Sequence, residues 1–126
     1  MCSVINGGYY YQPHLVKAIK DSHGGIVKSI EPTLLKQTIS SGISSDIRSY
    51  MELSVQQGTS RTSKVQGYSS GGKTGTAEKY PRGNKKYLVS FIGFAPVERP
   101  EVVIYVVVDE PNVEDQANST YAQFIA

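Results

Sequence analysis

The sequence predicts an α+β domain, an antiparallel sheet with flanking helices, and three observations support this fold class. Residues 87–95 and 101–108 are two strongly apolar segments, each of strand length. Residues 96–100 join them and contain two prolines, a length typical of an antiparallel hairpin. Residues 44–57 carry apolar side chains at helical spacing and are followed by Gly58. The length of 126 residues corresponds to one domain of ordinary size.

The first half of the chain predicts shorter elements. An apolar pair precedes Asn-Gly-Gly at residues 6–8, which predicts the end of a helix with Asn or Gly in the left-handed cap. Residues 13–32 predict a hairpin that turns at residues 21–25, with a helix as the alternative for its first half. Residues 59–72 are rich in Ser, Thr and Gly and predict an exposed loop that enters a strand.

Two helices are predicted in more detail. The first is capped by Ser44, Ser45 or Asp46, and its shared apolar face consists of Ile47, Tyr50, Met51 and Val55. Residues 116–126 predict the first turns of the second, with one face formed by Tyr121, Phe124 and Ile125. Residues 101–108 are apolar on both faces, so each face of this strand requires a cover. These features lead us to expect a piece of a larger domain.

The composition argues against several function classes. The formal net charge is +2, from 13 Lys and Arg against 11 Asp and Glu, which gives no electrostatic basis for binding nucleic acid. Cys2 is the only cysteine, so neither an internal disulfide nor a cysteine-rich zinc site is expected. His14 and His23 lack metal-ligand spacing, and we predict no metal and no cofactor. No segment approaches the ~18 apolar residues that span a bilayer.

The most informative segment is Gly-Gly-Lys-Thr-Gly-Thr-Ala-Glu-Lys at residues 71–79. Together with the four residues before it, it formally matches a phosphate-binding loop, G-x-x-x-x-G-K-[ST], over residues 67–74. Such a loop needs a buried strand before it and a helix after it. Residues 60–66 are polar, and Pro81 and Gly83 follow closely, so this interpretation is disfavoured.

Two other interpretations of the segment stay open. In the first, it is a glycine-rich strand edge with a solvated lysine, where Gly72 and Gly75 mark close backbone approach. In the second, it is a substrate-binding strand of a serine acyl-transfer enzyme, for which K-T-G is a known motif. Lys73 offers a positive charge, and Thr74 and Thr76 offer hydroxyls suited to a terminal carboxylate. Alternation places Lys73 and Gly75 on one side of the strand and the threonines on the other. We expect Glu78 and Lys79 to be solvated.

The surrounding sequence resembles one family over nearly the whole chain. Residues 6–17 resemble the helix end and following strand of penicillin-binding transpeptidases, and residues 71–79 resemble their third-motif strand. Residues 87–96 and 103–111 are similar to the next two strands of their sheet. The resemblance is closest to class B, monofunctional penicillin-binding proteins of the cell-division or sporulation type. It implies a partial penicillin-binding transpeptidase, or serine β-lactamase-like, domain.

The resemblance implies a function and a set of partners. In that family a serine attacks the D-alanyl-D-alanine end of a peptidoglycan stem peptide, and an amine from a neighbouring strand resolves the acyl-enzyme. β-Lactams trap the serine. By resemblance, Lys73 joins the network of the second-motif serine, Thr74 and Thr76 bind the substrate carboxylate, Gly75 lets the substrate approach, and the Thr76 N–H forms half of the oxyanion hole. The resemblance also implies the extracytoplasmic face of the membrane, an anchor outside this chain, and a division or sporulation complex.

Two family motifs are absent from the sequence. The only useful match to S-x-x-K is Ser70–Lys73, which overlaps K-T-G and does not open a helix, and no S-x-N occurs. We therefore expect residues 1–126 to be the C-terminal part of the transpeptidase domain, with the nucleophile elsewhere. Two alternatives stay open. One is a truncated, non-catalytic remnant or interaction module. The other is a serine β-lactamase or β-lactam sensor, which shares the K-T-G strand.

Overall fold

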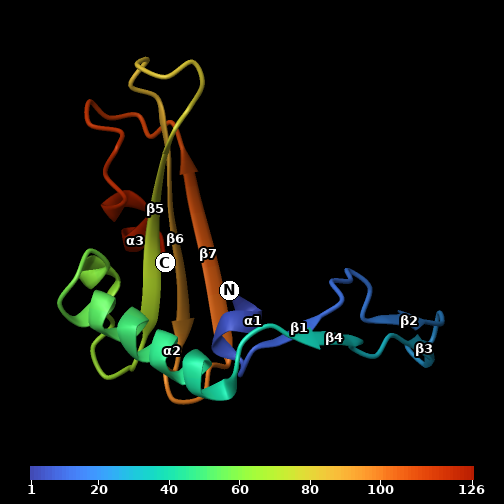
Figure 1. Ribbon diagram of the computed structural model, residues 1–126. Coiled ribbons are helices and arrows are strands. Elements are labelled where there is room, and N and C mark those ends of the chain that lie inside the picture. The colour runs from blue at the N-terminus through green and yellow to red at the C-terminus, as the bar shows by residue number, and fades with distance from the viewer.

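A three-stranded antiparallel sheet forms the centre of the molecule (Figure 1). The computed structural model describes residues 1–126, and the sheet has the order β5-β6-β7. Its strands are β5 (Gly71–Glu78), β6 (Tyr87–Ala95) and β7 (Val102–Asp109). The predicted hairpin of two apolar strands is therefore confirmed: it consists of β6 and β7, and β6 is the central strand of the sheet. The α+β fold class is also confirmed.

One long helix and several short helical segments flank the sheet. They are α1 (Cys2–Ile5), α2 (Ser41–Gln56), the 3-10 turn η1 (Arg61–Ser63) and α3 (Thr120–Ile125). The prediction that a helix ends at residue 6 is confirmed, because α1 is capped at Asn6 and Gly7 follows with φ +91°. None of the helices combines the length and the apolar character that a membrane-spanning segment needs.

The two faces of the sheet are covered differently. Because β5 and β6 pair without a register shift, Phe94 and Phe91 lie on opposite faces. Phe94 belongs to a buried cluster with Ile5 and Val97, against which Met51 of α2 packs. On the Phe91 face, α3 contacts β6 and β7, and its Ala122 is fully buried. The core is therefore two thin layers, one on each side of β6.

Helix α2 begins three residues earlier than predicted. Its cap is Ser40, whose side chain accepts a hydrogen bond from the Ile43 N–H at 3.3 Å. Ser44 is fully buried instead, because its hydroxyl accepts from the Gly7 N–H and donates to the Val4 carbonyl. Tyr50, expected on the apolar face, is 69% exposed. The prediction of the cap was wrong because several serines in a row could each cap a helix, and a contact with α1 decides between them.

The C-terminal helix is shorter than predicted. It begins at Thr120, and turns stabilised by side chains occupy residues 116–119. The Asn118 side chain accepts from the Thr120 N–H at 3.0 Å, an arrangement that competes with helix formation. The buried residues are Ala122 and Gln123, whereas Phe124 and Ile125 are exposed, so the predicted apolar face was wrong.

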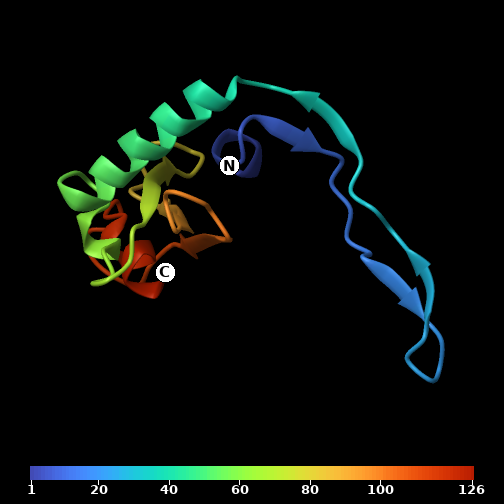
Figure 2. The ribbon, with the colours of Figure 1, turned by 90° about the horizontal axis from the view of Figure 1, so that it is seen from below.

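Residues 9–38 form an arm that extends away from the sheet (Figures 1 and 2). It consists of two antiparallel ribbons: β1 (Tyr9–Tyr11) pairs with β4 (Leu34–Gln37), and β2 (Ala18–Lys20) pairs with β3 (Ile26–Ser29). The predicted hairpin is confirmed, and its helical alternative is wrong. No residue of the arm is buried. The arm therefore adds nothing to the core.

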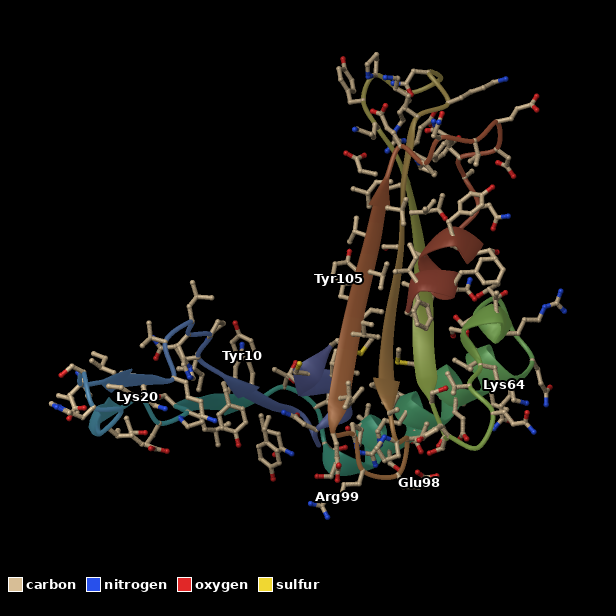
Figure 3. All side chains as sticks on the ribbon, turned by 180° about the vertical axis from the view of Figure 1, so that it is seen from behind. Tyr10, Lys20, Lys64, Glu98, Arg99 and Tyr105 are labelled. Atoms are coloured by element: carbon tan, nitrogen blue, oxygen red, sulfur yellow. The ribbon has the colours of Figure 1, made fainter.

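Strand β7 is one of the two open edges of the sheet, and β5 is the other. The outer edge of β7 has no partner strand, and Val102 and Tyr105 are each about 60% exposed (62% and 61%). Figure 3 shows Tyr105 on this outer strand. The sequence required a cover for each face of this apolar strand, and within these 126 residues α3 supplies only part of one.

Candidate functional site

The segment Gly71–Glu78 is strand β5, at the edge of the sheet opposite β7. A phosphate-binding loop needs a helix after its lysine, so the strand excludes that interpretation. Only β6 pairs with β5, which leaves one edge of β5 open. Helix α2 contacts this strand, and its Glu52 backbone lies beside Gly71 at the first residue of β5. Lys73 and the residues after it are therefore the accessible part of the strand.

Main-chain groups of β5 alternate between β6 and the open edge. The Lys79 N–H donates to the Lys86 carbonyl at 2.8 Å, so Lys79 and every second residue before it bond to β6. The main-chain groups of Thr74 and Thr76 then point to the open edge. In agreement, the Thr74 carbonyl accepts a hydrogen bond from Lys73 Nζ at 2.8 Å. An extended peptide laid along this edge would meet the N–H and C=O groups of both threonines.

The four expected site residues lie on two faces of the same strand. Lys73 and Gly75 lie on the Phe94 face, and Thr74 and Thr76 lie on the Phe91 face, because the register runs from Gly71 to Glu78 without a bulge. Thr76 is exposed, and its hydroxyl donates to the Ala117 carbonyl at 3.4 Å. Lys73 is exposed and takes part in no ion pair. Two of its three ammonium donors are free for an anion.

Each glycine of β5 stands where a side chain would collide with a neighbour. A Cβ at Gly71 would collide with the ring of Phe94, and one at Gly72 would collide with the ring of Phe91. These two glycines therefore accommodate one aromatic ring on each face. A Cβ at Gly75 would lie 2.6 Å from Ser90 Oγ, on the Lys73 face. Ser90 was missed at the sequence level, because only the strand register shows that it lies behind K-T-G.

Charged residues gather at the far end of β5. Lys79 Nζ lies 2.9 Å from Asp109 Oδ1 and 2.7 Å from Glu110 Oε1, so the expectation that Lys79 is merely solvated was wrong. The hydrogen bonds that Lys79 donates to Glu110 and Asp109 raise the pKa of Lys79 above its ordinary value. Those that Glu110 accepts from Lys79 and Lys86 hold the pKa of Glu110 below its ordinary value. Glu78 accepts from the Gly83 N–H at 2.7 Å.

An apolar pocket of about 210 Å³ lies away from these groups. It occupies the Phe91 face near the start of β5, and its walls include Val65, Ile104 and Ala126. None of the four expected site residues lines it. No cluster of His, Cys, Asp and Glu side chains could hold a metal ion. The open edge of β5 is therefore the candidate site.

The groups at the open edge of β5 are suited to binding a ligand. A free ammonium, two hydroxyls and outward main-chain N–H groups can bind an extended peptide that carries a carboxylate. Ser70–Lys73, the formal S-x-x-K match, lies at the start of β5 and does not open a helix.

Three comparisons with known proteins bear on this site. The family model of the penicillin binding protein transpeptidase domain matches residues 1–126. Stage V sporulation protein D of Bacillus subtilis (strain 168) is 42% identical over 124 residues, which cover 95% of this chain. Penicillin-binding protein H of the same organism is 31% identical over 135 residues, which also cover 95% of this chain.

The solved structures agree with the sequence relatives. A D,D-transpeptidase domain of a peptidoglycan glycosyltransferase from Eggerthella lenta superposes with a TM-score of 0.77, at 29% identity, over 98% of this chain and 28% of that one. This chain spans 19% of the length of each of the two curated relatives. The comparisons therefore concern one part of larger proteins.

Proposed function

This chain belongs to the penicillin-binding protein transpeptidase domain family, and on that premise we propose that it supplies the substrate-binding strand of a peptidoglycan D,D-transpeptidase. The observation that carries the proposal is the open edge of β5. Lys73, Thr74, Gly75 and Thr76 follow one another there, with the main-chain groups of both threonines facing outward.

The substrate of this edge is the D-alanyl-D-alanine end of a stem peptide, or a β-lactam in its place. Lys73 is an exposed cation, and Thr74 and Thr76 carry hydroxyls, so a carboxylate at this edge can be bound by charge-assisted hydrogen bonds. The outward Thr76 N–H is suited to the developing oxyanion of an acyl transfer. Gly75 keeps the strand free of a side chain where the peptide passes.

The serine nucleophile and its lysine come from residues other than these 126, because this chain contains no S-x-x-K that opens a helix. In this proposal, residues 1–126 are the C-terminal part of the transpeptidase domain. The parent protein acts at the extracytoplasmic face of the membrane, within a division or sporulation complex. The similarity to stage V sporulation protein D favours the sporulation role.

The proposal is tested in a chimera of Penicillin-binding protein H, a relative whose name records penicillin binding. In this chimera, residues 1–126 replace the matching segment of the relative. We expect fluorescent penicillin to label the chimera covalently, and we expect Lys73→Met to lower the labelling rate tenfold or more, about the value of one charge-assisted hydrogen bond. The matched control is Lys64→Met, an exposed lysine in the loop before β5.

The isolated chain provides the complementary measurement. Because it lacks the nucleophile, intact-mass spectrometry after penicillin treatment is expected to show no adduct. A chimera that melts like Penicillin-binding protein H but binds no penicillin would contradict the proposal. So would an isolated chain that gains the mass of one penicillin, since the nucleophile would then lie within these 126 residues.

A further inference from the structure

One carboxylate connects both ends of the loop that follows β5. Glu110 Oε1 lies 2.7 Å from Lys79 Nζ, and Glu110 Oε2 lies 3.1 Å from Lys86 Nζ. Lys79 directly follows β5, and Lys86 directly precedes β6. Each oxygen of Glu110 therefore binds one stem of the loop at residues 80–85. We call Glu110 with these two lysines the Glu110 bridge.

Main-chain hydrogen bonds hold the Glu110 bridge in register. The Lys79 N–H donates to the Lys86 carbonyl at 2.8 Å, which closes the loop. The Glu110 N–H donates to the Tyr87 carbonyl at 2.9 Å, which fixes Glu110 against β6. Glu110 has φ +46°, an uncommon conformation for a residue with a side chain. The carboxylate is thus presented from a backbone that is itself bonded to the central strand.

The Glu110 bridge begins at the residue that directly follows β5. Thr76 is three residues before Lys79, and the Glu78 carboxylate between them accepts from the Gly83 N–H inside the loop. Lys79 lies on the same face of the strand as Lys73 and Gly75, because residues alternate along β5. A peptide on the open edge that extends past Thr76 would therefore meet this loop.

We propose that Glu110 is a positioning residue of the transpeptidase site: it holds the end of β5 and the loop at residues 80–85 in place beside the bound substrate. This inference rests on the proposed function. Glu110 touches neither substrate nor nucleophile in this proposal. It acts by tying β7 to the two stems of the loop across β6.

The structure indicates how a variant would behave. Lys79 keeps Asp109 as a partner at 2.9 Å when Glu110 becomes neutral, whereas Lys86 loses its only ion pair. The pairs are substantially exposed, so they stabilise the fold little. Glu110→Gln is therefore expected to loosen the loop while the melting temperature stays within about 3 °C of the unsubstituted protein.

The experiment uses the Penicillin-binding protein H chimera with Glu110→Gln, Lys79→Met and the double substitution. Hydrogen exchange is measured for peptides covering residues 79–87, and the second-order rate constant of penicillin acylation is measured beside it. We expect Glu110→Gln to speed exchange in these peptides and to lower the acylation rate constant about two- to fivefold. The double substitution is expected to lower the rate constant by less than the product of the two single effects, because the Lys79–Glu110 contact is lost in both single variants. The matched control is Glu101→Gln, at the other end of β7, where Arg99 lies 3.9 Å away.

Each result decides the proposal. Unchanged exchange in residues 79–87 overturns it, and so does faster exchange with an unchanged acylation rate constant, since the loop would then not act on the site. Faster exchange throughout the chimera, or an equal effect of Glu101→Gln, also overturns it. If the unsubstituted chimera binds no penicillin, the proposed function fails and the positioning role fails with it. A labelled chimera that Glu110→Gln leaves unaffected refutes the positioning role alone.

Discussion

Gly75 and Ser90 face one another across β5 and β6, and each limits what the other position can hold. A Cβ at Gly75 would lie 2.6 Å from Ser90 Oγ but 4.0 Å from Ser90 Cβ, so the conflict involves the hydroxyl alone. Ser90 is 9% exposed and makes no hydrogen bond through this hydroxyl within the chain. A side chain at position 75 would therefore conflict with a single atom of the central strand.

We expect Gly75→Ala to destabilise the chimera by about 1–3 kcal/mol, the usual cost of an overpacked site. Adding Ser90→Ala removes the conflicting oxygen and is expected to restore most of the lost stability. Chemical denaturation of the single and double variants measures this. Gly42→Ala is the control, because its Cβ would have only Ser40 Oγ nearby, at 3.9 Å, and alanine favours the helix. Equal losses with and without Ser90 would contradict the coupling.

The candidate site residues could be chosen from the sequence, and their place on one strand is confirmed, whereas their neighbours from other strands could not be predicted. Lys73, Thr74 and Thr76 stand in one contiguous motif, so their proximity follows from the chain itself. Ser90 and Glu110 lie 15 and 31 residues after Gly75 and Lys79, as the numbering shows. Only the register of three strands brings them to the motif, and register depends on hairpin geometry that a single sequence does not fix.

At the scale of elements, the central strand was predicted to the residue and the helices were not. Strand β6 spans residues 87–95 as expected, because its apolar run is bounded by polar residues and a proline. Helix α2 begins at Ser41 because the contact of Ser44 with α1 competes with a capping role. The local sequence pattern was enough to predict the bounds of β6. The start of α2 depends on the contact between Ser44 and Val4, which are 40 residues apart in the sequence.

Ser44 provides a test of that contact. Its hydroxyl accepts from the Gly7 N–H at 3.0 Å and donates to the Val4 carbonyl at 2.7 Å. We expect Ser44→Ala to lower the free energy of unfolding of the chimera by about 1–3 kcal/mol, because two backbone groups lose their partner. Ser45→Ala, exposed one residue later, is the control and is expected to stay within about 0.5 kcal/mol. If the two variants unfold alike, Ser44 acts only as an ordinary helix residue.

At the scale of the whole molecule, the outer edge of β7 has no partner strand. This strand offers unpaired main-chain groups and exposed Val102 and Tyr105 along its length. Long, apolar edge strands are templates for pairing with another chain. The isolated chain is therefore expected to self-associate.

A charge on the edge tests this expectation. We expect Tyr105→Lys to raise the monomeric fraction of the isolated chain in analytical ultracentrifugation, because a lysine on an edge strand opposes pairing. Tyr50→Lys, on the exposed side of α2, adds the same charge away from the edge and is expected to have a smaller effect. A chain that is monomeric and unfolds cooperatively without any substitution would show that β7 needs no further cover.

The two ends of the arm at residues 9–38 lie side by side where the arm joins the rest of the molecule. A Cβ at Gly8 would collide with the Ile39 carbonyl oxygen, so the two stems touch where residues 9–38 begin and end. The Thr38 N–H donates to the Gly8 carbonyl at 2.7 Å at the same place. A segment with adjacent ends and no buried residue can lengthen, shorten or be exchanged without repacking the sheet. The arm can therefore change in length or sequence while the three-stranded sheet and its open β5 edge keep their packing.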